Sequence, residues 1–219
     1  LKEVGPGLWI AELPLRFLGI EVGRQMTVTR LADDRLRIHS PSELTGACAA
    51  ELEALGEPRY VVAASAIHGH VSMEQYRDAY PAARLYAAPM IDRRRKDLAF
   101  DGILGSSPKP PWIGELDQIV FQGQLLPEVL FRHREIRTLI AGGLLVQIPP
   151  DSPRATRIAW RLDGVGESLG TPRTFRATCR TRRAARHSHE GPLKWEFNRI
   201  HVGHGANVET DGRARFEAR

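Results

Sequence analysis

The order of apolar runs along the chain predicts a layered α/β protein, with helices packed outside β-sheets. Strand-like and helix-like stretches alternate in the first half, and the order strand, helix, strand implies parallel pairing. After residue 117, several β-rich runs follow one another with short connections, as in a sheet of hairpin-linked strands. The length of 219 residues and the hydrophobic content of 42% suit one domain over residues 1–219 with a sizeable core.

Three short strands open the chain. They read "LWIAEL" from Leu8, "MTVTRL" from Met26 and "RLRIHS" from Arg35. Asp33 and Asp34 separate the last two, which predicts a hairpin.

A helix is predicted in "SPSELTGACAAELEALG", where Ser40 or Ser42 is the candidate N-cap and Gly56 the stop. Apolar residues recur at helical spacing within it: Leu44, Cys48, Leu52 and Leu55. We therefore expect this helix to lie on a sheet.

A second cycle of strand, helix and strand follows. "RYVVAAS" is predicted to be a buried strand, Met73 to Tyr80 a short helix, and "ARLYAAP" the next strand. "DGILGSSPKPP", from Asp101 to Pro111, has the composition of a surface loop.

The remaining elements complete the second half. "QIVFQG", "EVLFRH" and "TLIAGGLLVQI" are predicted strands, "WEFNRIHVGHG" a last strand that ends in a glycine-flanked histidine, and "TDGRARFEA" a terminal helix.

Charge and cysteine content restrict the classes of protein. The formal net charge is +5, but the basic residues are nearly all arginine, a bias that more often reflects genome composition than a nucleic-acid partner. Cys48 and Cys179 lie far apart without the spacing of a metal knuckle, and we expect reduced thiols. No window approaches the roughly 18 apolar residues of a membrane span, so we expect a soluble, cytoplasmic protein with no membrane partner.

The order of these elements resembles the metallo-β-lactamase-like superfamily, in a bacterial branch with a degenerate metal motif. Three stretches carry the resemblance: "SAIHGHVSMEQYRDAYPAARLYA", "EVLFRHREIRTLIAGGLL" and "WEFNRIHVGHGANVETDGRARFEA". It implies an αββα sandwich, in which two mixed β-sheets pack face to face with helices outside. It also implies loops at one sheet edge that converge on one or two metal ions.

The first motif of that superfamily, His-x-His-x-Asp-His, is not filled in either of two registers. In one, His68 and His70 take the first two positions, which leaves Ser72 and Met73 where Asp and His belong. That register would join the two histidines with His133 around one metal.

We favour the second register, which the distance to "YPAARLYA" sets. In it Ser65 and Ile67 replace the first pair, and His70 takes the position of the last histidine. Gly143 stands where the superfamily has the aspartate that bridges two metals, which argues against a dinuclear centre.

A mononuclear site is the metal hypothesis that remains, with four candidate ligands: His68, His70, His133 and His204. Zinc is the first candidate ion, with iron or manganese as alternatives. The absence of any metal is an equally weighted alternative, because His68 and His70 can instead cap the helix that begins near Met73.

The arginine-rich segment from Arg173 to His187 is the other feature that could bind a ligand. It contains one aromatic residue, Phe175, whereas platforms for single strands use several. The helical spacing of its arginines indicates a charged outer face, so a nucleic-acid partner is not favoured.

Three functions follow as hypotheses. The first is a metal-dependent hydrolase in which His70, His133 and His204 hold one ion whose bound water attacks an ester, amide or phosphoester. The second is a non-catalytic protein of the same fold that binds a small molecule or a protein. The third is anion or nucleic-acid binding through the arginine-rich segment. A homodimer is left open.

Overall fold

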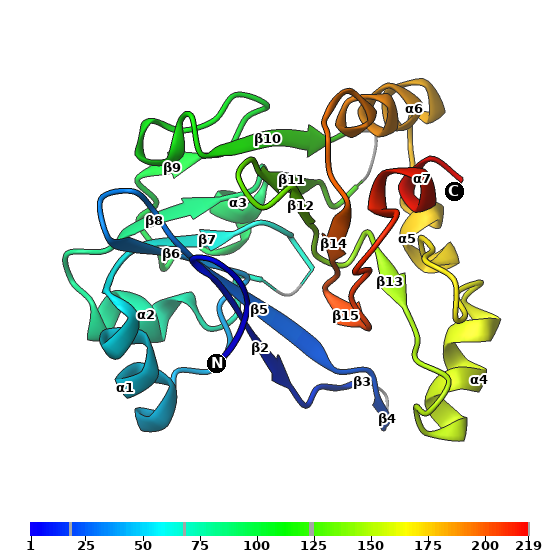
Figure 1. Cartoon of the computed structure of the whole chain (residues 1–219), viewed down its shortest axis with the longest axis horizontal. Coiled ribbons are helices and arrows are strands. Elements are labelled where there is room, and N and C mark those ends of the chain that lie inside the picture. Colours follow the sequence, from blue (N-terminus) through cyan, green and yellow to red (C-terminus); the bar gives the residue numbers. More distant parts are fainter. Residues whose placement is uncertain (18, 68, 123–124, 219) are drawn as a thin grey trace.

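The computed structural model describes residues 1–17, 19–67, 69–122 and 125–218. Within them, the larger of two main sheets has the strand order β1-β2-β5-β6-β7-β8-β9 (Figure 1). Its strands are β1 (Lys2–Gly5), β2 (Leu8–Leu13), β5 (Arg24–Arg30), β6 (Arg35–His39), β7 (Glu57–Ala63), β8 (Arg84–Ala87) and β9 (Gly102–Ile103). Neighbours from β1 to β6 pair antiparallel and those from β6 to β9 pair parallel, which confirms the predicted hairpin and the parallel strand, helix, strand unit.

The second main sheet has the order β10-β11-β12-β14. Its strands are β10 (Leu116–Phe121), β11 (Glu128–His133), β12 (Thr138–Ile140) and β14 (Arg199–His201). Two smaller pairs join β3 (Arg16–Phe17) to β4 (Ile20–Glu21) and β13 (Val146–Gln147) to β15 (His204–Gly205). The run predicted as one strand, "TLIAGGLLVQI", is thus divided between β12 and β13 because the chain turns at Gly142 and Gly143.

The helices lie outside the two sheets (Figure 1). They are α1 (Gly46–Leu55), α2 (Met73–Ala79), α3 (Ile91–Arg94), α4 (Arg154–Leu162), α5 (Arg173–Ala177), α6 (Arg182–Glu190) and α7 (Gly212–Glu217), with two short 3₁₀ turns, η1 (Pro110–Trp112) and η2 (Pro192–Lys194). The first two contact β7, whereas α6 contacts β10 and α7 contacts β14. This arrangement confirms the predicted αββα sandwich. No described helix is long and apolar enough to cross a membrane.

The start of α1 differs from the prediction. Thr45 is the N-cap, and its hydroxyl accepts a hydrogen bond from the Cys48 backbone N–H at 3.2 Å. Ser42 instead lies buried in the preceding loop, where its hydroxyl contacts the Met26 sulfur at 3.4 Å. The predicted caps were wrong because the loop after β6 packs into the core before the helix begins.

The largest apolar cluster joins residues of both sheets, so their facing surfaces form the core. Ile38 and Val62 of the first sheet and Phe131 and Ile140 of the second all belong to it. A second cluster lies between the second sheet and the helices α5 to α7, and it includes Phe175 and Phe216. The sandwich is therefore closed on both faces of the second sheet, which leaves its edges to carry loops and polar groups.

Candidate functional site

Strands of both sheets meet at one edge of the sandwich, which we call the site edge. The backbone after β7 continues into Ser65, which forms an isolated antiparallel bridge with Glu128 at the start of β11. The turn after β12 lies beside them, and the turn after β14 contacts it through the Gly203 N–H, which donates to the Gly142 carbonyl at 3.0 Å. Because β7, β12 and β14 end here, three loops converge on the first residue of β11.

Glu128 is the centre of the site edge. Its side chain is fully buried, and its carboxylate oxygens accept backbone N–H bonds from Gly142 at 2.8 Å and Leu144 at 3.1 Å. The Gly143 N–H and the Ser65 hydroxyl also donate to it. One carboxyl group thereby binds the β7 loop of the first sheet to the β12 loop of the second.

Glycine makes this contact sterically possible. A Cβ atom on Gly142 would lie 3.0 Å from Glu128 Oε2, and one on Gly203 would lie 2.5 Å from the Gly142 carbonyl carbon. Side chains at these two positions would push the loop away from the carboxyl group. Gly142, in "AGGLL", therefore allows the backbone to surround the buried carboxyl group of Glu128.

The carboxyl group of Glu128 titrates near neutrality. Burial raises its pKa to about 7, since desolvation disfavours the charged form, although the N–H and hydroxyl donors act in the opposite direction. Ser65 is buried with it, and its oxygen also accepts the Ile67 N–H at 3.3 Å. Neither side chain is exposed to solvent, so neither is accessible to a substrate.

His70 lies in the loop before α2, beside two cations. Burial lowers the pKa of its imidazole, and the guanidinium groups of Arg95 and Arg94 lower it further. Arg95 also donates to the His70 carbonyl at 2.5 Å. The positive charge that disfavours a protonated imidazole also disfavours a metal cation beside it.

His133 lies at the opposite end of β11 from Glu128. The two residues are five positions apart on an extended strand, which corresponds to about 16 Å. His133 is buried, and burial together with the Arg37 guanidinium lowers its pKa, while Glu135 acts in the other direction. It therefore lies far from the site edge.

His204 is placed at the start of β15 by the turn that follows β14. Its Nδ1 donates to the Gly23 carbonyl at 2.6 Å, and its ring centroid lies 5.9 Å from that of Trp160 on α4. Burial lowers its pKa. The imidazole thus connects the turn before β5 with α4.

The three described candidate histidines, His70, His133 and His204, are not grouped as a metal site. Within the described residues, no three histidine, cysteine, aspartate or glutamate side chains are grouped so that they could hold an ion. His70, His133 and His204 each have their own surroundings, and His68 lies outside the described residues. The described donors consequently do not fit the single ion that the resemblance implies, and a ligand role for the four histidines stays a prediction.

Comparison with known proteins defines the fold. No family profile and no curated protein matches the sequence. Solved structures do match: the DIM-1 metallo-β-lactamase has a TM-score of 0.67 at 11% identity, covering 99% of this chain and 94% of that chain. The metallo-β-lactamase from Pontibacter korlensis has 0.61 at 9% identity, with 99% and 96% covered. This chain has the metallo-β-lactamase fold.

The metallo-β-lactamase fold extends to proteins with other names. The metal-soaked Flv1 flavodiiron core from Synechocystis sp. PCC6803 has a TM-score of 0.69 at 10% identity, covering 98% of this chain and 58% of that chain. Identities this low establish the architecture, and the chemistry has to be argued from the residues of this chain.

Two positions that the sequence assigned to lost metal ligands now have a structural explanation. Ser65, aligned with the first histidine of the motif, and Gly143, aligned with the bridging aspartate, both donate hydrogen bonds to Glu128. Sequence reasoning missed Glu128, although one signal was present: an acidic residue opens the apolar run "EVLF". An acid that enters a buried strand needs partners, and here they come from the loops of the site edge.

Proposed function

We propose that this chain is a non-catalytic member of the metallo-β-lactamase fold that works by binding a partner. One observation carries the proposal: the carboxyl group of Glu128 is fully buried and hydrogen-bonded at the point where the loops of the site edge converge. Ser65 and Gly143, which align with metal-ligand positions of the superfamily, donate hydrogen bonds to this acid. The loops of the site edge are therefore organised around a side chain of the protein itself.

The alternative is a metal-dependent hydrolase that uses His70, His133 and His204, with or without His68. A catalytic ion needs about three protein ligands and an open position for water. The three described imidazoles are held by different neighbours, and two of them lie beside arginine side chains. The geometry therefore favours binding over hydrolysis.

A nucleophilic mechanism through Ser65 is also disfavoured. Its hydroxyl donates to Glu128, which resembles a nucleophile with a base, but both side chains have 0% exposure. A nucleophile has to reach its substrate within about 3 Å to 3.5 Å. The pair is better explained as a structural connection between the two sheets.

Elemental analysis tests the proposal. Protein without a histidine tag, produced in medium supplemented with zinc, iron and manganese, is expected to contain metal well below one equivalent per chain. His133→Ala and His204→Ala should leave that value unchanged. Stoichiometric metal that both substitutions remove would contradict the proposal and restore the hydrolase.

A further inference from the structure

We propose that the face formed by α5, α6 and the adjoining pocket binds single-stranded nucleic acid. The proposal names a partner for the binding role described above and rests on that role, but it concerns a different face of the molecule from the site edge. It depends on the distribution of charge, the exposure of the arginines and one aromatic side chain.

The positive charge of the chain is concentrated in one segment. Residues 154–189 contain nine arginines and two acidic residues, a formal charge of +7, whereas the whole chain carries +5. The rest of the chain therefore carries −2. A genome-wide preference for arginine would distribute the charge evenly, so this concentration is a property of the α4 to α6 region.

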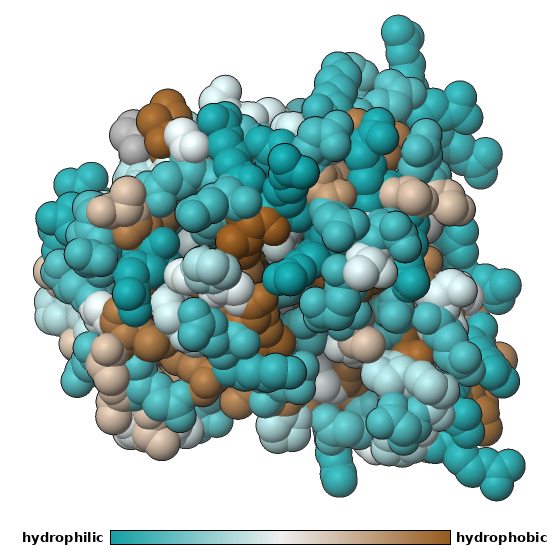
Figure 2. All heavy atoms as spheres, in the orientation of Figure 1, coloured by the Kyte–Doolittle hydropathy of each residue, from teal (hydrophilic) through white to brown (hydrophobic). Residues whose placement is uncertain are grey.

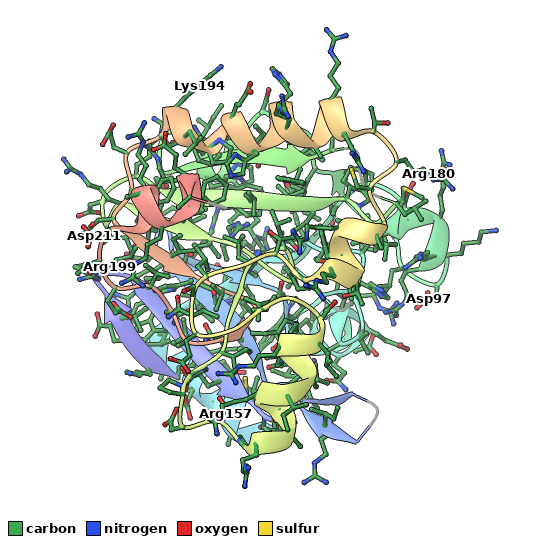
Figure 3. The ribbon with its side chains drawn as sticks, turned by 90° about the vertical axis from the view of Figure 1, so that its right-hand side faces the viewer. Asp97, Arg157, Arg180, Lys194, Arg199 and Asp211 are labelled. Atoms are coloured by element: carbon green, nitrogen blue, oxygen red, sulfur yellow. The ribbon has the colours of Figure 1, made fainter. Side chains whose placement is uncertain are left out.

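The arginines of this segment are available to a ligand. All six between positions 173 and 186 are exposed, and none forms an ion pair with a described carboxylate: Arg173, Arg176, Arg180, Arg182, Arg183 and Arg186. Ser188, on the opposite side of α6, accepts the Gln122 N–H at 2.9 Å and fixes which side of the helix faces the sheet. Figure 3 views this side of the molecule, where Arg180 projects from the loop before α6, and hydrophilic side chains cover α6 in Figure 2.

A pocket adjoins the carboxyl end of α6. It has a volume of about 300 Å³, at the lower end of the range for ligand pockets. Ile119 and Trp195 supply apolar walls, and the exposed side chains of His187 and Lys194 also line it. A base can stack on Trp195 while its phosphate contacts Lys194, and the neighbouring phosphates of the strand can follow α6 toward its arginines.

The carboxylate that lines the pocket does not cancel this charge. Asp117 lines the pocket, but its carboxylate pairs with Arg132 and Arg134. Glu190 at the end of α6 lies 3.9 Å from His187. Lys194 has no ion pair with a described carboxylate, so a phosphate meets at least one free cation at the pocket.

The position of Trp195 favours single-stranded nucleic acid as the partner of this face. Between Arg173 and His187 the sequence contains one aromatic residue, Phe175, and this residue is buried. The shortage of aromatic residues in that segment argues against nucleic acid. The structure adds an aromatic surface from outside the segment. The competing partner is an anionic lipid surface, because Ile158 and Leu162 are exposed one turn apart on α4.

Fluorescence anisotropy with a labelled oligouridine, on the full chain after treatment with EDTA, tests the proposal. The affinity should fall steeply with salt. The triple variant Arg182→Glu, Arg183→Glu, Arg186→Glu should bind at least about tenfold more weakly, because three phosphate contacts become repulsive. Trp195→Ala should lose roughly fivefold or more and Trp195→Phe should retain most of the affinity, since phenylalanine keeps a stacking surface.

A matched control separates specific contacts from net charge. Lys2, Arg93 and Lys96 are exposed outside this face, and changing all three to glutamate alters the charge by the same amount. An equal loss in this control, no binding by the wild type, or equal competition by polyglutamate would overturn the proposal. So would stronger binding to vesicles of phosphatidylglycerol and phosphatidylcholine that Ile158→Ser abolishes.

Metal content is measured on the same preparations before the EDTA treatment. Stoichiometric metal in a protein that still binds oligouridine would contradict the proposed non-catalytic role alone. A metal-free protein that does not bind it would overturn this partner alone.

Discussion

The two ends of β11 present two ways of burying an ionisable side chain. At the first end, Glu128 is surrounded by backbone N–H groups and a hydroxyl. Beside the last residue, His133, the guanidinium of Arg37 is fully buried without a hydrogen-bond partner among the described residues. Its central carbon lies 3.9 Å from the centre of the Phe131 ring and 5.0 Å from that of Trp112.

The difference shows what each end contributes. Hydrogen bonds to Glu128 join the loops after β7 and β12, so this acid is part of the connection between the sheets. Arg37 is stabilised by aromatic faces, and burial still lowers its pKa to about 9. We infer that the first end is organised around hydrogen bonds to its carboxyl group, whereas the second end holds a cation against aromatic rings.

The removal of the Glu128 carboxyl group should have the largest effect on stability. Glu128→Ala leaves the buried Ser65 hydroxyl and the Gly142 and Leu144 N–H groups without an acceptor, and should lower the free energy of unfolding by about 4 kcal/mol. Urea unfolding measures it. Glu135→Ala, an exposed control near the other end, should change stability by less than about 0.5 kcal/mol. Equal effects of the two substitutions would remove the contrast between the ends.

The pH dependence of stability is the next effect. The folded protein keeps the Glu128 proton up to about pH 7, but the unfolded chain releases it near 4.5, so folding takes up a proton between these values. The contribution is complete below the unfolded pKa and is lost as pH rises through the folded pKa. Relative to Glu128→Gln, the wild type should lose about 3 kcal/mol of stability between pH 4.5 and 7.5.

Measuring the difference between two proteins is essential here. Burial lowers the pKa of His201 to about 4. This histidine makes the protein less stable as pH falls, which is the opposite of the pH dependence expected from Glu128. It contributes equally to both proteins and cancels. Parallel stability curves for wild type and Glu128→Gln would show that Glu128 is not a proton-binding group in this range.

The smallest effect concerns the other end of the strand. Arg37→Met keeps most of the volume and removes the buried charge, so we expect the protein to become about 1 kcal/mol more stable at pH 7. Arg37→Lys should be less stable than wild type, because an ammonium group is more strongly hydrated and cannot stack on Phe131. If methionine destabilises the protein as much as lysine does, the guanidinium of Arg37 has a stabilising hydrogen-bond partner.

Much of the fold could be predicted from local patterns. The β5–β6 hairpin, the parallel pairing of β7 with β8 and the terminal helix α7 follow from alternation, spacing and turn residues, which act over a few positions. The helix α4 was missed: it contains one buried residue, Thr156, and its exposed face carries Ile158 and Leu162, so it has no apolar stripe facing the core.

The candidate site was less predictable. The histidines were identified from a motif, but whether imidazoles meet depends on which end of a strand each occupies, and His133 lies at the end opposite Glu128. In the same way, Trp195 lines the pocket beside α6 because η2 packs against that helix.

The sequence by itself determined the order of elements, the layered architecture and the concentration of arginine between positions 154 and 189. Only the tertiary structure decided that the acid at position 128 meets Ser65 and the glycine turn after β12. The physical reason is range: propensity and periodicity act between neighbours, whereas burial of a charge depends on donors from segments that are distant in the chain.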